Sequence, residues 1–82
     1  MSDKRICTIT IIVEGDRSVV APLVNKTLSE YGDYIVARLG LPLNDRSVSV
    51  ICVVLEGSTD MLGALTGKLG NIQGIKVKSI TV

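Results

Sequence analysis

The sequence contains no histidine, phenylalanine or tryptophan, and its aromatic residues are limited to Tyr31 and Tyr34. The lack of histidine removes the commonest general base and the commonest metal ligand of proteins. Cys7 and Cys52 are the only cysteines, and two thiolates are too few for a closed zinc site. We therefore expect no catalytic residue, no bound metal and no cofactor, and the chain is not predicted to be an enzyme.

The sequence also lacks an excess of one charge and a long hydrophobic run. Nine Lys and Arg residues accompany eight Asp and Glu residues, which argues against a protein that binds nucleic acid by neutralising phosphates. No apolar stretch reaches the ~20 residues that span a bilayer, and no signal-peptide core follows the first basic residues. With two cysteines and no export signal, we expect a cytoplasmic protein without nucleic-acid or membrane partners.

What the sequence does contain is enough aliphatic material for one domain over residues 1–82, because 46% of the chain is apolar. A core without Phe or Trp must be built from Val, Ile, Leu and Ala. A chain of this length buries only roughly 60% of the surface that its unfolded form exposes. Small domains of this kind often gain stability by association with other chains.

Short apolar runs with period-two alternation predict four strands. The first run alternates Cys or aliphatic side chains at odd positions with threonine at neighbouring even positions. The second holds Gly40 and Pro42, which favour an edge strand or a bulge. The third is nearly continuous in apolar residues, which is typical of a central strand. The predicted strands are 4–14, 33–43, 48–57 and 75–82.

Apolar residues at three- and four-residue spacing predict helices over 17–32 and 58–70. Because Pro22 is tolerated only near a helix start, we expect the first helix to begin near Ser18 or Val19. A turn is expected at residues 44–47. The predicted apolar face of the first helix consists of Val20, Leu23, Val24, Leu28 and Tyr31, and the predicted capping residues of the second are Ser58, Thr59 and Asp60.

The order of these elements, β-α-β-β-α-β, predicts an α+β fold, the ferredoxin-like sandwich. Right-handed crossovers place both helices on one face of a four-stranded antiparallel sheet. The other face of the sheet then has no helix over it, and its composition decides whether the chain needs a partner.

We expect five large aliphatic side chains on that uncovered face. The expectation places Cys7, Ile9, Ile11 and Val13 of the first strand, and Val48, Val50, Cys52 and Val54 of the third, under the helices. A patch of this size is unusual on a monomer, so it predicts a homo-oligomer, either a dimer or a tetramer. The ordinary alternative is scattered exposed aliphatics. The five predicted interface residues are Ile6, Ile12, Ile51, Val53 and Leu55.

Gly63 and Gly67 lie four residues apart on one face of the second predicted helix. They do not form a phosphate-binding loop, because the spacing is one residue short and Leu69 follows Lys68 where Ser or Thr is needed. The favoured interpretation is close packing against the first helix or a neighbouring subunit. The alternative is a surface where a ligand approaches the backbone.

Three further residues are candidates for polar recognition. Gly15 and Asp16 lie in the turn from the first strand into the first helix, where free backbone N–H groups favour anions. Asp16 or Ser18 is also expected to cap that helix. Arg38 lies in an apolar strand segment, where an arginine either reaches solvent or pairs with a carboxylate or anion.

The two cysteines are expected to face inward on adjacent central strands, where they would be near each other. The favoured interpretation is a pair of buried free thiols that act as small apolar residues. Redox sensing and soft-metal binding are the alternatives, although burial tends to make a thiol inert.

Four segments together resemble the ACT-like family of iron-only hydrogenase system regulators. The most distinctive is "LGALTGKLGNIQGIKVK" at 62–78, and the others are "TITIIVE" (8–14), "YIVARLGLP" (34–42) and "VVLEG" (53–57). The resemblance covers essentially the whole chain. It implies an ACT-like fold and kinship with the C-terminal domain of nickel-responsive repressors.

The resemblance also implies function. ACT-like domains pair side by side and bind small effectors at the interface, near the turn that corresponds here to Gly15 and Asp16. Because the chain has no His and no recognisable DNA-binding segment, we expect neither a nickel site of that kind nor direct DNA contact. The resulting prediction is an oligomeric regulatory module that binds a small effector and acts through a protein partner in hydrogenase-related gene expression or maturation. The alternative is a non-catalytic interaction module with no ligand.

Overall fold

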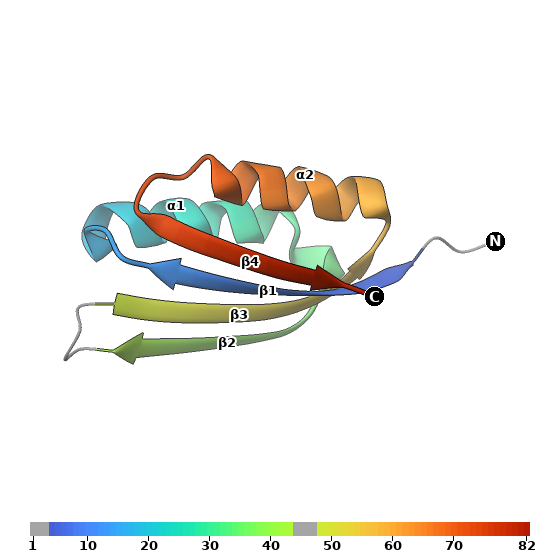
Figure 1. The fold of residues 1–82 in the computed structure, drawn as a ribbon, viewed down its shortest axis with the longest axis horizontal. Helices are drawn as coiled ribbons and strands as arrows, with labels where there is room; N and C mark the ends of the chain where they lie inside the picture. Colours follow the sequence, from blue (N-terminus) through green and yellow to red (C-terminus); the bar gives the residue numbers. More distant parts are fainter. Residues whose placement is uncertain (1–3, 44–47) are drawn as a thin grey trace.

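The computed structural model describes residues 4–43 and 48–82 and arranges them as a four-stranded sheet with two helices on one face (Figure 1). The strand order is β2-β3-β1-β4, and every neighbouring pair is antiparallel. The predicted ferredoxin-like sandwich is therefore confirmed, whereas the turn expected at 44–47 lies outside the described residues. The elements are β1 (Arg5–Val13), α1 (Arg17–Glu30), the short 3₁₀ helix η1 (Gly32–Tyr34), β2 (Ile35–Leu43), β3 (Val48–Gly57), α2 (Thr59–Gly70) and β4 (Ile75–Thr81).

Helix α1 begins at Arg17, slightly before the predicted start, because Asp16 caps it. The Ser18 backbone N–H donates to Asp16 Oδ1 at 3.0 Å, which satisfies one of the free donors of the first turn. The buried residues Val20, Val24 and Leu28 form a single stripe at four-residue spacing. Leu23 was expected on this stripe, but it lies roughly 100° around the helix from Val24 and is exposed.

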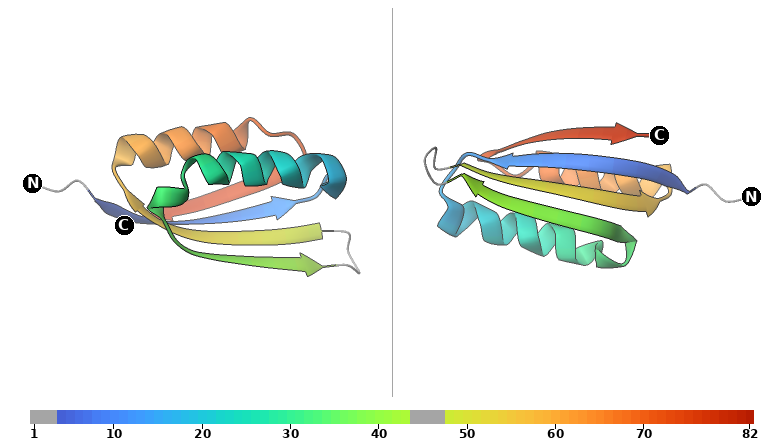
Figure 2. Two further views of the ribbon diagram at one scale, coloured as in Figure 1. Left: turned by 180° about the vertical axis from the view of Figure 1, so that it is seen from behind. Right: turned by 90° about the horizontal axis from the view of Figure 1, so that it is seen from below.

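Helix α2 begins at Thr59 and is capped by Ser58, one of the three predicted candidates. The Met61 backbone N–H donates to Ser58 Oγ at 3.1 Å. The helix buries three leucines against the sheet, and Figure 2 shows it on the same side of the sheet as α1. The buried leucines are Leu62, Leu65 and Leu69.

The core lies between the helices and the two central strands. The β1 side chains predicted to face the helices do so, and all four have no exposed surface, namely Cys7, Ile9, Ile11 and Val13. They pack with the apolar stripes of both helices in one continuous cluster. Both β1 and β3 are paired on two sides and form the centre of the sheet.

The predicted orientation of β3 is wrong. The register places Leu55 opposite Cys7, Val53 opposite Ile9 and Ile51 opposite Ile11, and residues directly opposite each other share a face of the sheet. Ile51, Val53 and Leu55 are therefore buried under the helices and are not available to an interface. Both faces of β3 are apolar, so its own sequence could not fix which side faces the helices, and a shift by one residue reverses every side chain.

The two cysteines lie on opposite faces of the sheet, so the expectation that they are close together is also wrong. Cys7 is completely buried under the helices, whereas Cys52 is half-buried on the side without helices. The Thr10 hydroxyl lies 3.9 Å from Cys52 Sγ, and Thr81 Oγ1 lies 3.4 Å from Cys7 Sγ. Both thiols are free.

Strand β2 is an edge strand, as its glycine and proline predicted. A bulge between Ile35 and Ala37 changes the side to which its residues point. Ile35 packs against the core, whereas alternate residues after the bulge point away from the helices, because they pair with the outward-facing residues of β3. The outward residues of β2 are Ala37, Leu39, Leu41 and Leu43.

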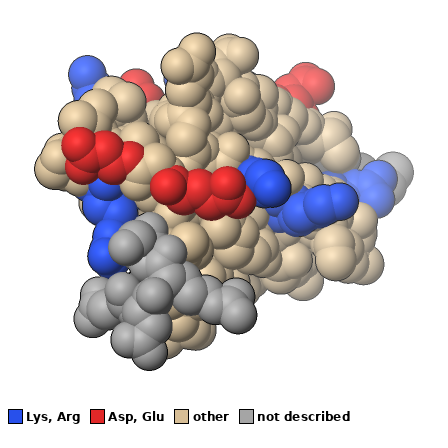
Figure 3. Space-filling model, turned by 60° about the vertical axis from the view of Figure 1, so that its left-hand side comes forward, with Lys and Arg blue, Asp and Glu red and all other residues tan. Residues whose placement is uncertain are grey.

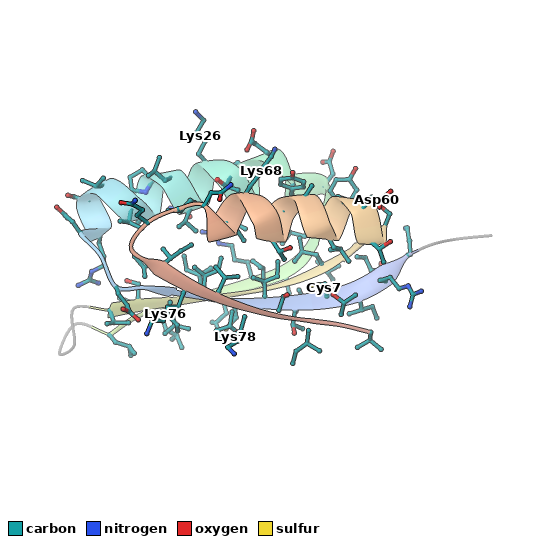
Figure 4. The ribbon with its side chains drawn as sticks, turned by 45° about the horizontal axis from the view of Figure 1, so that its top comes forward. Cys7, Lys26, Asp60, Lys68, Lys76 and Lys78 are labelled. Atoms are coloured by element: carbon teal, nitrogen blue, oxygen red, sulfur yellow. The ribbon has the colours of Figure 1, made fainter. Side chains whose placement is uncertain are left out.

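We call the side of the sheet without helices the open face. The predicted members Ile6 and Ile12 do lie on it, Ile6 being exposed and Ile12 half-buried. Lys76 and Lys78 of β4 also point to this side (Figure 4). On the open face, β2 and β3 present aliphatic side chains and Cys52, with Glu56 at the end of β3 opposite Ile6. The β1 and β4 side of this face carries threonines and lysines beside Ile6, Ile12 and Ile80.

Candidate functional site

The turn after β1 is closed by a contact with the loop before β4. The backbone N–H groups of Glu14 and Gly15 both donate to the Gly74 carbonyl, at 2.8 and 2.9 Å. Gly74 has a positive φ of 92°, and the Cα atoms of Gly15 and Gly74 face each other so closely that a Cβ on Gly15 would lie 3.2 Å from Gly74 Cα. The Gly15 N–H, expected to be free, is therefore occupied within the chain.

Asp16 is likewise engaged in capping α1. Its Oδ1 accepts from the Ser18 hydroxyl at 2.7 Å as well as from the Ser18 N–H. These hydrogen bonds, that of the hydroxyl first, lower the pKa of the Asp16 carboxyl below its ordinary value. The ligand-binding role predicted for Gly15 and Asp16 stays a prediction, since in this structure both residues hold the turn together.

Beside this turn, an open groove of about 320 Å³ runs between α1 and the edge strand β2. One wall is the stripe of α1 that faces β2 and includes Ala21 and Asn25, and the other wall includes Arg38, Gly40 and Pro42 of β2. Gly40 and Pro42 present little side chain toward the helix, which leaves the space open. Small-molecule sites in proteins commonly have volumes of ≈ 300–1,000 Å³, so the groove is large enough for a small ligand.

Two guanidinium groups border this groove. Arg38 donates through Nη2 to the side-chain oxygen of Asn25 on α1. Arg17, in the first turn of α1, donates through Nη1 to Ser49 Oγ at 3.2 Å, and Ser49 lines the groove. Both partners are neutral, and among residues 4–43 and 48–82 neither arginine forms an ion pair. Among the described residues, no carboxylate pairs with the positive charges held at the groove.

Arg38 was singled out from the sequence, and the structure places it where it reaches across to a helix. Arg17, Asn25 and Ser49 were missed. Arg17 and Asn25 are eight residues apart, which puts them on the same side of α1, two helical turns apart. That spacing was visible in the sequence, but its meaning depended on knowing that β2 lies beside this side of the helix.

Gly63 and Gly67 are exposed on α2 and are distant from this groove. A Cβ added at either position would meet nothing within 4 Å, so the predicted close packing against the first helix is not present. Gly63 lines a separate hollow of about 240 Å³ between α2 and β4, together with Thr66 and Ser79. Packing of these glycines against another subunit, and a ligand at this surface, both stay predictions.

A third hollow of about 390 Å³ lies at the opposite end of the sheet, near Tyr34 and Met61. Its ionisable residues carry mixed charge, since Lys4 stands with Asp33 and Glu56. It therefore offers no preference for a ligand of one sign. The α1–β2 groove is distinguished from it by two cations with neutral partners.

Acidic and basic residues are interspersed on the end of the molecule shown in Figure 3, where neither sign forms a continuous patch. In the part of the chain that the structure describes, no three His, Cys, Asp or Glu residues gather as a metal ion would require. Within the same residues, none of the helices has the length and apolar character needed to cross a membrane.

Comparison with known proteins gives one family. The profile of the TM1266-like family, whose description reads "Iron-only hydrogenase system regulator, putative", matches residues 5–79. No curated protein matches the chain.

Among solved structures, the uncharacterized protein TM1266 from Thermotoga maritima is 38% identical, with a TM-score of 0.91 over 96% of this chain and 98% of its own. A formyltetrahydrofolate deformylase from Pseudomonas putida KT2440 is 13% identical, with a TM-score of 0.63 over 90% of this chain and 28% of the deformylase. At that identity the second likeness concerns the fold alone.

Proposed function

This chain belongs to the TM1266-like family of iron-only hydrogenase system regulators, and on that premise we propose that it is a regulatory module that binds a small anionic effector and works as a homo-oligomer. The α1–β2 groove is the proposed binding site. The family description supplies the proposed setting, the iron-only hydrogenase system. We propose that the module acts there through a protein partner.

The observation that carries this proposal is the pair of arginines at the groove. A guanidinium is always charged and presents several donors in a plane, which suits carboxylate and phosphate groups. In the part of the chain that the structure describes, Arg17 and Arg38 donate to the neutral partners Ser49 and Asn25. An anion could replace these partners with a gain in charge pairing. Gly40, which has no side chain, leaves room for a ligand to approach the strand.

A binding role fits the available chemistry better than catalysis does. With no histidine in the sequence, the serine and threonine hydroxyls lack the usual general base. Cys7, the more deeply placed thiol, is fully buried. The groove is lined by one guanidinium (Arg38), one side-chain amide (Asn25) and one hydroxyl (Ser49), which are groups that recognise a ligand.

Thermal unfolding against a panel of amino acids, nucleotides, inorganic phosphate and divalent metals tests the proposal. A ligand present at a hundred times its Kd adds ~2.7 kcal/mol to the stability of the native state, which raises the Tm of a domain of this size by about 10 °C or more. We expect a shift from a carboxylate- or phosphate-bearing compound. The replacement Arg38→Gln should abolish most of it.

The matched control is Lys26→Gln, which removes a positive charge from the side of α1 that points away from the sheet (Figure 4). This variant should keep the full shift, because Lys26 does not line the groove. If the two variants lose the thermal shift equally, binding of the anion depends on net charge alone and the groove is not its site.

A second candidate function is an interaction module without a ligand. It is favoured by the row of exposed leucines on the open face, Leu39, Leu41 and Leu43, which a protein partner could cover. The two functions separate experimentally, because a pure interaction module would show no shift with any compound on the panel and would still capture a protein partner.

A further inference from the structure

We infer that the apolar half of the open face is the surface through which two copies of this chain pack, sheet against sheet. This inference rests on the oligomeric part of the proposed function and adds to it the residues of the contact. Leu41 and Val50 of this surface also line the α1–β2 groove, but the inference is argued from the exposed apolar face and needs no bound anion. The surface, which we call the hairpin patch, is formed by Ala37, Leu39, Leu41 and Leu43 of β2 with Val48, Val50, Cys52 and Val54 of β3.

The hairpin patch is exposed to a degree that is unusual for leucine. Leu39, Leu41 and Leu43 leave 56%, 48% and 40% of their surface uncovered, although they stand side by side on alternate positions of one strand. The four β3 residues opposite and beside them are half-buried. The patch therefore combines exposed and half-exposed apolar side chains of two paired strands, and Figure 2 shows that both helices lie on the other side of the sheet.

The hairpin patch can supply the centre of a dimer contact. Its exposed apolar area is on the order of 500 Å², judged from the leucine exposures, within the ≈ 300–600 Å² of the largest patch on a typical monomer. A stable interface buries ≈ 800 Å² per partner. The half-buried Ile12 and the aliphatic stems of side chains at the margin supply part of the remainder.

The charges around the patch favour a second copy as the occupant. None of its eight side chains carries a carboxylate, ammonium or guanidinium, and Glu56, the next residue of β3 on this face, lies at its margin. The patch itself therefore offers little to select an acidic or basic partner. The chain has a net charge of only +1, so two copies repel each other weakly. A two-fold axis brings the same patch on both copies together, which makes an apolar surface self-complementary.

The lysines of β4 fix where the contact is centred. Lys76 and Lys78 point to the open face on the strand farthest from β2 (Figure 4). If the contact is centred on the β2–β3 hairpin, β2 of each copy lies over β3 of the other, and both lysines stay in solvent at the rim. Centring it on the whole sheet would bury their charges at a considerable cost.

Sedimentation velocity over a range from micromolar to several hundred micromolar tests the inference. We expect the wild type to sediment at twice the 8.7 kDa chain mass or more, and Leu41→Glu to reduce that mass by half or more. The control is Leu23→Glu on α1, because Leu23 and Leu41 are both 48% exposed. This control should keep the wild-type mass. Leu39→Lys provides a second disruption of the patch, and circular dichroism verifies that each variant is folded.

The native cysteines provide an independent readout. Cys52 lies in the hairpin patch, whereas Cys7 has no exposed surface, so alkylation of the folded protein by iodoacetamide reports on Cys52. We expect its rate to fall at least tenfold between dilute and concentrated wild-type protein. In Leu41→Glu it should stay fast at both concentrations.

Three outcomes would overturn the inference. In the first, the wild type would sediment at 8.7 kDa at every concentration. In the second, Leu41→Glu would keep the wild-type mass, and the association would then be assigned to a strand edge. In the third, the monomer would co-sediment with phosphatidylglycerol vesicles through the patch, which would make it a membrane surface. The anion proposal is judged separately, by the Arg38→Gln thermal shift.

Discussion

At the scale of single residues, glycine serves two different purposes in this chain. Gly74 needs its positive φ, and its carbonyl holds the two N–H groups at the end of β1. Gly63 and Gly67 lie in regular helix and have free space where a side chain would begin. Position 74 requires glycine because of its backbone conformation, whereas no contact among residues 4–43 and 48–82 requires glycine at positions 63 and 67.

This contrast predicts opposite effects of the same substitution. Gly67→Ala should stabilise the protein by about 0.5–1 kcal/mol, because alanine lowers the entropic cost of forming the helix. Gly74→Ala should destabilise it by about 1–3 kcal/mol for two reasons: the methyl group would crowd Val20, and alanine is strained at this positive φ. Urea unfolding of both variants measures the difference. A loss of stability in Gly67→Ala would instead show that another subunit covers this side of α2.

At the scale of elements, the cap of α1 predicts a pH dependence. The hydrogen bonds from Ser18 hold the folded pKa of Asp16 below its ordinary value of 3.8. A depressed folded pKa means that the carboxylate contributes its full stabilisation above pH 3.8 and loses it as the pH falls through the folded value. The Tm deficit of Asp16→Ala relative to wild type should therefore be greatest near neutral pH and shrink in acid.

Asp16→Asn is the matched control for this prediction. Asparagine caps helices about as well as aspartate and does not ionise. The Tm of Asp16→Asn should therefore exceed that of Asp16→Ala by the same amount at every pH, as measured by thermal unfolding in a buffer series. An equal acid dependence in Asp16→Asn would assign the effect to another carboxylate.

The elements also show how far sequence reasoning reaches. Strands and helices were predictable because their apolar spacing differs, and the inward face of β1 was predictable because threonine alternates with aliphatics. The inward face of β3 was not predictable, since both of its faces are apolar. Only the register of β3 with Cys7 and Ile9 of β1 determines which of its side chains face the helices. The alternation of Leu39, Leu41 and Leu43 was visible, but the bulge before Ala37 determined their side. Of the polar residues at the groove, the sequence identified Arg38 alone, because the others lie on α1 and β3 and come together only in the folded chain.

At the scale of the whole molecule, charge determines which partners are excluded. The net charge is +1, and opposite charges are interspersed on the surface in Figure 3. Affinity for duplex DNA depends on releasing counterions from many phosphates at once. We expect no mobility shift of duplex DNA at micromolar protein and low salt. A shifted band that weakens as salt rises would show a basic surface formed on assembly.

The pairing of β1 with β4 has a consequence for the architecture of larger proteins. The Val82 N–H donates to the Ile6 carbonyl at 2.9 Å, so the first and last strands enter and leave the sheet at the same corner. A short peptide could close the chain into a ring, and new ends could be opened in a surface turn without loss of contacts. Duplication of the coding segment would likewise join two copies of the domain in tandem within a single polypeptide.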